Sequence, residues 1–298
     1  MDPLARLGRL LRAGHYRFVT PTPETHRRVV ARQGRAKDLR GVFGWSLPFE
    51  RPLLPKEMFD LLGEAGALVE AGAGLFTSAV RYSTIGGLCC VHSAYPTLAA
   101  DSVFFGPDTY RFASLIESRI IESPGHVVDV GCGSGAGGLL LAGRAASVQL
   151  LDINQKALAY AAANAALNGL SAKVAHSDVL AGAQDPIDLV IANPPYLADE
   201  QARTYRDGGG PHGTSLSVRI AKEALGRLHT GGRLLLYTAT PVVDGEHVLW
   251  PELRPLLVER TTFEYRELDP DVFGEELDRP AYAHAERIAV VALDAIKG

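Results

Sequence analysis

The segment Asn193-Pro194-Pro195-Tyr196 places an amide, two prolines and an aromatic ring directly after an apolar run. A residue before proline is held in extended conformations, so the side-chain oxygen of Asn193 and the carbonyl oxygen of Pro194 should be fixed in position. Two fixed acceptors can bind both N–H groups of a planar nitrogen and direct its lone pair at an electrophile. Tyr196 would offer its ring to the flat group that carries this nitrogen. The segment therefore predicts chemistry at an amide or a base amino group, although a plain turn has the same residue types.

A glycine-rich segment, VVDVGCGSGAGG, occupies residues 127–138. Gly131, Gly133 and Gly135 would let the chain turn sharply and let a ligand approach the backbone closely. The spacing also fits the G-x-G-x-x-A pattern of dinucleotide-binding proteins, which leaves an NAD-type oxidoreductase open. The segment has no Lys-Ser or Lys-Thr pair, so a P-loop that hydrolyses nucleoside triphosphates is not expected.

Three aspartates end consecutive predicted strands, at the edge of the sheet where ligands bind in this class of fold. Asp129 is suited to the ammonium group of an amino acid. Asp152 can accept hydrogen bonds from both hydroxyls of a ribose, and Asp178 can accept one from an adenine amino group. Together these acids predict a pocket for a cationic adenosyl amino acid.

Strands that alternate with helices predict an α/β fold, a doubly wound and mostly parallel sheet. The last two strands have no obvious helix between them and should form an antiparallel hairpin at one edge. The predicted strands are 126–130, 147–153, 172–178, 187–193, 233–239, 261–268 and 286–293, and the predicted helices are 136–146, 154–170 and 215–229. Residues 1–95 have a different pattern, with a helix at 56–70 and short strands at 74–93. We expect a small α+β accessory domain for substrate recognition at 1–95, followed by a catalytic domain at 96–298.

Composition narrows the class of protein. The chain has 298 residues, no apolar run long enough to span a membrane, and no uninterrupted signal-peptide core. Its three cysteines form neither a disulfide framework nor a metal-ligand spacing, so no metal and a reducing cytoplasm are expected. Residues 1–40 carry ten Arg or Lys and three acids, a net charge of +7, whereas the whole chain has −4. This basic arm could bind nucleic acid, or it could pack on the acidic remainder of the chain.

Residues 105–298 resemble the class I S-adenosylmethionine-dependent methyltransferases, which have a seven-stranded Rossmann-like sheet. DVGCGSGAGG is similar to their first motif, LLDI (150–153) to the ribose-binding segment, HSDV (176–179) to the adenine-binding segment, and NPPY to the catalytic motif of the amino-methyltransferases. VFFGPDTYRF (103–112) resembles the segment before the core of the HemK-like protein-glutamine N5-methyltransferases, but lacks an arginine that this group typically has.

The resemblance implies S-adenosylmethionine as the methyl donor and S-adenosylhomocysteine as the product. The implied cofactor-binding residues are Asp129, Gly131, Gly133, Ser134, Gly135, Asp152, Ile153, Asp178, Val179 and Asn193. The implied catalytic residues are Asn193, Pro194 and Tyr196, and the substrate-binding candidates are Pro195, Tyr196, Thr109 and His212. A glycine run at 206–215 could fold over the substrate.

The resemblance favours a protein glutamine amide as the methyl acceptor. Four alternatives stay open: a nucleic-acid adenine or guanine amino group, a small-molecule amine, an NAD-type oxidoreductase, and a binding module without catalytic activity. The number of subunits cannot be predicted from these patterns.

Overall fold

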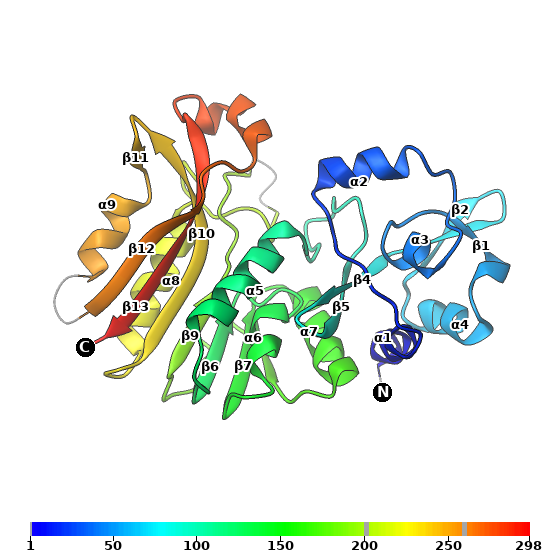
Figure 1. Ribbon diagram of the computed structural model, residues 1–298, viewed down its shortest axis with the longest axis horizontal. Coiled ribbons are helices and arrows are strands. Elements are labelled where there is room, and N and C mark those ends of the chain that lie inside the picture. Colours follow the sequence, from blue (N-terminus) through cyan, green and yellow to red (C-terminus); the bar gives the residue numbers. More distant parts are fainter. Residues whose placement is uncertain (1, 200–202, 258–260) are drawn as a thin grey trace.

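The computed structural model describes residues 2–199, 203–257 and 261–298. Its centre is an eight-stranded sheet (Figure 1). Seven strands follow the order β12-β13-β10-β9-β6-β7-β8, and the short β11, which pairs with β10, is the eighth. Strands β10, β9, β6, β7 and β8 run parallel, and β13 lies antiparallel between β10 and β12. The strands are β6 (His126–Val130), β7 (Ser147–Asp152), β8 (Lys173–His176), β9 (Leu189–Ala192), β10 (Arg233–Val243), β11 (Glu246–His247), β12 (Thr261–Asp269) and β13 (Arg287–Lys297).

Helices cover both faces of this sheet. Alternate residues of β6, β9 and β10 point to opposite faces, so each strand contributes to two hydrophobic clusters. One cluster contains the helices α5 (Pro107–Arg119), α6 (Ala136–Leu141) and α7 (Gln155–Asn168), and the other contains α8 (Ser215–Arg227) and α9 (Trp250–Leu253). Burial of both faces explains why these strands read as continuous apolar runs.

The predicted fold class is confirmed, including the antiparallel pair of last strands. Local signals also placed helix α7 correctly. The Asn154 side chain accepts a hydrogen bond from the Lys156 N–H at its start, and Gly169 ends it with a φ of 69°. Two helices end well before their predicted ends. Helix α6 ends at Leu141, and the predicted helix at 56–70 stops at Glu64, after which Leu68 begins a strand.

The first 95 residues form helices and small antiparallel sheets beside the central sheet (Figure 1). The helices are α1 (Pro3–Ala13), α2 (Pro23–Val30), α3 (Leu39–Phe43) and α4 (Lys56–Glu64), and a short 3-10 turn spans Arg51–Leu53. The strands are β1 (Phe49–Glu50), β2 (Leu68–Gly72) and β3 (Leu75–Ser78), followed by the hairpin β4 (Val80–Ile85) and β5 (Leu88–Ser93).

The two predicted domains share one hydrophobic cluster across their boundary. Buried residues of α1 and of the β4–β5 hairpin pack against the buried side of α7. Asn164 of α7 is fully buried, accepts a hydrogen bond from the Val91 N–H at 2.7 Å, and donates to the Val91 and Ser134 carbonyls at 3.0 and 2.8 Å. One amide thus joins the N-terminal hairpin, helix α7 and the glycine loop.

Asn164→Ala should lower the free energy of unfolding by about 2–4 kcal/mol, because it leaves a buried N–H and two buried carbonyl groups without a partner. Urea denaturation measures this loss. Asn154→Ala serves as the control, since removal of a helix N-cap costs about 1 kcal/mol. An equal or smaller loss in Asn164→Ala than in the control would show that this bridge contributes little to stability.

Candidate active site

A cavity of about 740 Å³ lies at the carboxyl edge of the parallel strands. It extends from the tips of β6, β7 and β8, past the Asn-Pro-Pro-Tyr segment, to the start of helix α2 in the N-terminal region. Thr22, Pro23 and Glu24 therefore belong to its wall. The predicted accessory domain contributes directly to the site.

The glycine loop connects β6 to α6 along this wall. Gly131, Gly133 and Gly135 have φ values of 66°, 53° and 80°, a region that other residues enter only with strain. The N–H of Gly133 donates to the Asp152 carboxylate at 2.8 Å, which joins the loop to the tip of β7. Ser134 is buried in the same wall. All three glycines therefore adopt the backbone conformation for which the sequence predicted glycine.

Asp129 is the most buried acid of the wall, with 2% of its surface exposed. Its carboxylate accepts a hydrogen bond from the Gly138 N–H at 2.7 Å in helix α6. A Cβ atom on Gly137 or Gly138 would lie 3.2 or 3.1 Å from Asp129, so these glycines let the helix approach the carboxylate. Burial raises the pKa of Asp129 to about 7.

The other two strand-end acids are held in different ways. Both oxygens of Asp152 accept backbone N–H groups, from Gly133 and from Asn154, each at 2.8 Å. Asp178 is exposed and forms a two-bond ion pair with Arg219 of α8 at 2.8 and 2.9 Å, which lowers the pKa of Asp178. Local sequence patterns do not indicate this arginine, because it lies 41 residues away on another element.

Two apolar residues complete this end of the cavity. Ile153 has 55% of its surface exposed and lies in the cavity wall beside Asp152, where it can cover a flat base. Val179 follows Asp178, is buried, and has a φ of 49°. All the predicted cofactor-binding residues except Gly135 line this one cavity, and Gly135 lies within the loop.

The Asn-Pro-Pro-Tyr segment follows β9 and leaves its two predicted acceptors available. No described residue forms a hydrogen bond with the Asn193 side chain or with the Pro194 carbonyl, and both residues line the cavity. Tyr196 differs from the expectation of an open aromatic face. It is only 8% exposed, and its ring packs 6.1 Å from that of Phe273. Burial, and next the charge of Asp108, raise the pKa of Tyr196.

The other substrate-binding candidates lie in different places. Pro195 and Thr109 line the cavity, and the Thr109 hydroxyl also accepts the Gly106 N–H at 3.2 Å at the start of α5. His212 is absent from the cavity wall, and its ring nitrogen Nδ1 faces the Ala281 carbonyl at 3.2 Å. The structure thus separates His212 from the other candidates.

The glycine run is packed against the chain that follows Tyr196. The Gly208 N–H donates to the Leu197 carbonyl at 2.9 Å, and the Leu197 N–H donates to the Arg206 carbonyl at 3.1 Å. A Cβ atom on Gly213 would collide with the backbone of Leu197. The glycines here allow close backbone packing, and a role of the run in covering the substrate stays a prediction.

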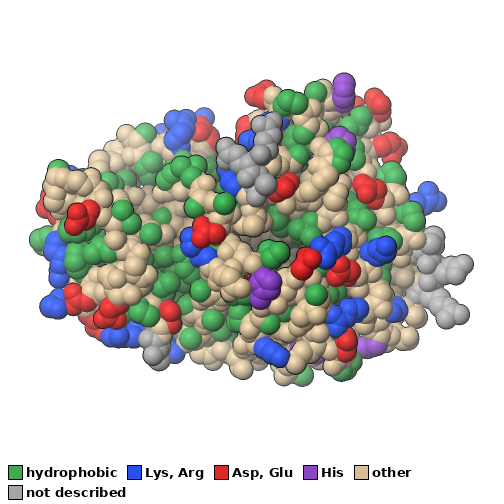
Figure 2. Space-filling view, turned by 180° about the vertical axis from the view of Figure 1, so that it is seen from behind, with side chains coloured by type: hydrophobic (Ala, Val, Ile, Leu, Met, Phe, Trp, Pro, Cys, Tyr) green, Lys and Arg blue, Asp and Glu red, His purple; other side chains and the backbone are tan. Residues whose placement is uncertain are grey.

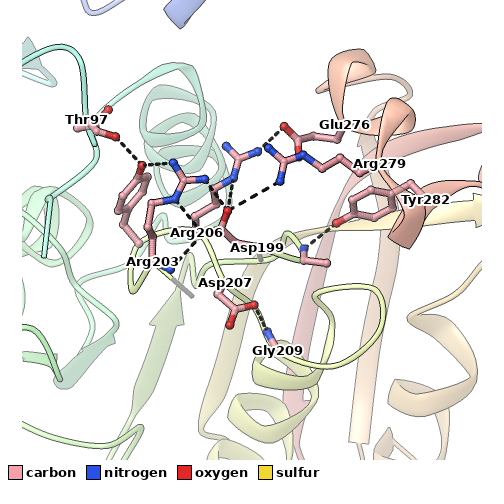
Figure 3. Close-up of polar contacts among 11 residues, drawn as sticks. Thr97, Asp199, Arg203, Arg206, Asp207, Gly209, Glu276, Arg279 and Tyr282 are labelled. Atoms are coloured by element: carbon pink, nitrogen blue, oxygen red, sulfur yellow. Dashed lines mark hydrogen bonds and ion pairs between the residues drawn. The ribbon is translucent and has the colours of Figure 1, made fainter. Parts of the chain in front are cut away.

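A buried ionic cluster holds the next segment in place (Figure 3). Asp199 has a fully buried side chain and binds Arg203 through Nε at 2.8 Å, and Arg206 lies 3.4 Å from the same carboxylate. Glu276 lies in the excursion between β12 and β13, the segment that contains the 3-10 turns Gly274–Asp278 and Pro280–Tyr282. Its carboxylate binds Arg206 and also Arg279 of the same excursion. The cluster therefore fixes Arg206 of the cavity wall against the C-terminal part of the chain.

The charges of the cavity wall are strongly unequal. The acids are Glu24, Asp108, Asp129, Asp152, Asp178, Asp207, Asp271 and Glu275, and the bases are Arg111 and Arg206. Arg111 pairs with Asp108 and Asp269, and Arg206 with Asp199 and Glu276. Such a wall favours a cationic ligand over an anionic one.

Most arginines of the basic arm are engaged within the chain. Arg9 and Arg12 bind the C-terminal end of α7, through the Ala166 carbonyl and the Asn168 side chain. Arg6, Arg27, Arg28 and Arg35 form ion pairs with glutamates of residues 1–95. On the face in Figure 2, basic and acidic side chains are interspersed, and no broad basic patch is visible.

Comparison with known proteins agrees with this geometry. Residues 108–249 match the family model of the methyltransferase small domain. This part of the chain is therefore similar to a methyltransferase small domain. The match begins in helix α5 and ends after β11, so it contains the glycine loop, the three aspartates and the Asn-Pro-Pro-Tyr segment.

Two curated relatives are similar to part of this chain. A release factor glutamine methyltransferase from Deinococcus radiodurans is 36% identical over 177 residues, which cover 55% of this chain and 59% of the relative. A ribosomal RNA small subunit methyltransferase C from Alcanivorax borkumensis is 31% identical over 121 residues, which cover 41% and 34%. The chain thus spans about three fifths of the first relative and about one third of the second.

The fold also matches solved structures. A Pyrococcus horikoshii protein is 14% identical with a TM-score of 0.52, over 81% of this chain and 83% of that one. Among the described residues, no cluster of His, Cys, Asp and Glu has the arrangement of a metal site. The helices in the described ranges are too short or too polar for a membrane span.

The buried Asp129 makes a pH dependence of stability testable. Its pKa in the folded chain, about 7, lies above the ordinary value of 3.8, so the folded state binds the proton more tightly than the unfolded state. Stability should therefore fall as the pH rises from about 4 to about 7, by up to roughly 4 kcal/mol at about 1.4 kcal/mol per pKa unit. Asp129→Asn should lose less stability than the wild type between these values in urea denaturation. Equal losses in both proteins would contradict the buried, protonated carboxyl.

Proposed function

We propose that this chain is an S-adenosylmethionine-dependent methyltransferase that methylates a planar nitrogen. The observation that carries the proposal is the pair of free acceptors on Asn193 and Pro194, which open into an acidic cavity beside the glycine loop. An NAD-type oxidoreductase is less compatible, because the buried Asp129 would lie near an anionic pyrophosphate.

The residues of the cavity fit the donor molecule in charge and shape. Asp152 keeps lone pairs for the ribose hydroxyls beyond its two backbone bonds, and the exposed Ile153 can pack against the adenine. Asp178 would accept from the adenine amino group, with Arg219 orienting its carboxylate. Asp129 would balance the charge of the amino-acid part. Bound S-adenosylmethionine supplies an electrophilic methyl group on a positively charged sulfur.

The Asn-Pro-Pro-Tyr segment would then act on the acceptor nitrogen. The Asn193 side-chain oxygen and the Pro194 carbonyl accept the two N–H groups, which favours loss of planarity and frees the lone pair. Tyr196 is packed between Phe273 and the groups around Asp108, so it would support the corner and contact the acceptor with its edge.

We favour the side-chain amide of a protein glutamine as the acceptor. Among the described residues, the cavity wall has no unpaired arginine or lysine, and at least six arginines of the basic arm are used inside the chain. Both features oppose binding of a phosphate backbone. The relative from Deinococcus radiodurans, a release factor glutamine methyltransferase, points to the same acceptor. All three cysteines are free and buried, which suits the reducing cytoplasm in which we place the enzyme.

A base amino group in nucleic acid is the second candidate. It is favoured by the similarity to a ribosomal RNA methyltransferase and by Arg17, Arg32, Lys37 and Arg40, which are exposed and form no ion pair among the described residues. Lysate labelling with methyl-tritiated S-adenosylmethionine, followed by protease or nuclease digestion, separates the two candidates. Label released by protease, with little effect of salt on the rate, supports the glutamine. Label released by nuclease, with a steep loss at higher salt, supports the second candidate.

Asn193→Ala and Asp152→Ala should separate catalysis from cofactor binding. Asn193→Ala should keep the affinity for S-adenosylmethionine and lower turnover by about 10²–10³, as expected for one preorganised polar group. Asp152→Ala should weaken cofactor binding by about 1.5–3 kcal/mol, the scale of hydrogen bonds to a charged group. Calorimetry and the labelling rate measure both effects. Normal turnover in Asn193→Ala would mean that the corner has only a structural role.

A further inference from the structure

A second acid, Asp108, lies in the cavity wall near Tyr196. It is the second residue of helix α5 and is 5% exposed. The Tyr237 hydroxyl of β10 donates to its Oδ1 at 2.8 Å, and the Arg111 guanidinium lies 3.2 Å from the same oxygen. Arg111 of the same helix and Tyr237 of β10 therefore hold this carboxylate in place. Asp108 and Tyr237 are 129 positions apart in the sequence.

The surroundings of this carboxylate hold it in one orientation. The N-terminal end of α5 favours a negative charge, and Arg111 supplies a positive one that is shared with Asp269 at 2.9 Å. The hydrogen bonds from Tyr237 and Arg111 both go to Oδ1, and the Tyr196 side chain also lies against this carboxylate. The charge of Asp108 also reaches Tyr196, whose pKa it raises.

Methyl transfer to a neutral nitrogen moves positive charge across the cavity. The nitrogen lone pair forms the new N–CH₃ bond, the S–CH₃ bond breaks with its electrons left on sulfur, and the charge passes to the nitrogen. A fixed anion on the acceptor side is stabilising in the transition state because it attracts this arriving charge. Asn193 and Pro194 offer only neutral oxygens for this purpose.

We propose that Asp108 is the fixed anion that stabilises the positive charge on the acceptor nitrogen and then takes its N–H proton. The proton transfer gives a neutral N-methyl product and a neutral carboxyl group, which returns to the carboxylate by releasing the proton to water. Tyr237 and Arg111 are the positioning residues of this carboxylate. The inference rests on the proposed methyltransferase function and adds a role for a residue outside the Asn-Pro-Pro-Tyr segment.

A binding experiment tests the charge without any acceptor substrate. Sinefungin carries a primary amine, protonated at neutral pH, where S-adenosylmethionine carries its S-methyl group, and S-adenosylhomocysteine carries no charge there. Calorimetry should show that the wild type prefers sinefungin. Asp108→Asn keeps the size and a hydrogen-bonding oxygen but removes the charge, so it should reduce this preference at least about tenfold. The melting temperature of the variant shows whether it folds.

Asp269→Asn is the matched control, because it removes the other acid bound to Arg111 outside the cavity wall. It should leave the preference within about twofold of the wild type. In the labelling assay, Asp108→Asn should lower the turnover number about 10²-fold at saturating cofactor, whereas a purely structural role predicts a nearly normal rate.

The outcomes separate this inference from the proposed function. A wild type that binds neither analogue would overturn the proposed function. Binding of both analogues without a preference in the wild type, or with the same preference in Asp108→Asn, would overturn the role of Asp108 alone. A lack of preference in the wild type would overturn the role of Asp108 even if Asp108→Asn fails to fold.

Discussion

The backbone hydrogen bonds that join β6 to β7 and β9 fix the site. Their register pairs Val130 with Leu151 on one side and with Ala192 on the other. The residues that follow these three positions, the first loop glycine, Asp152 and Asn193, must therefore emerge in one row at the same edge of the sheet. A shift by one residue in either strand pair would turn a functional side chain to the opposite face.

Negative charge is the second feature that unites the site. Eight acids and two paired arginines line a single cavity. Burial raises the pKa of one of these acids, Asp129, to about 7. Burial of carboxyl groups such as Asp108 and Asp129 opposes folding unless hydrogen bonds or a cation compensate. Backbone N–H groups compensate at Asp129 and Asp152, an arginine compensates at Asp178, and a cationic ligand would supply the rest. A wall of this kind suits a sulfonium compound better than a phosphate.

The acceptor end of the cavity is assembled from distant parts of the chain. Helix α2 comes from the N-terminal region, Asp108 from the start of α5, and Phe273 from the excursion between β12 and β13. The ionic cluster around Asp199 ties the segment after Tyr196 to that excursion, and Asn164 ties the hairpin to α7. In the proposed function, specificity for the acceptor would depend on these regions before and after the central sheet, and the relatives are named for different acceptors, a release factor glutamine and a ribosomal RNA.

The sequence by itself determined the features that depend on neighbouring residues. The alternation of apolar patterns predicted the sheet, and the glycines at 131, 133 and 135 predicted the loop, where the structure shows positive φ. Asn154 and Gly169 predicted the ends of α7. Each of these signals acts within a few residues. Local patterns also placed the three aspartates at strand ends.

Only the tertiary structure decided which charged and polar side chains contact each other. The pairs Asp178–Arg219 and Asp108–Tyr237 join elements 41 and 129 residues apart, and the arginines of the basic arm find partners in the same way. The same holds for the burial of Tyr196, whose ring the sequence predicted to be offered to the substrate, and for the backbone packing of the glycine run. Such contacts depend on how the helices and excursions pack on the sheet, and no spacing within one segment encodes that packing.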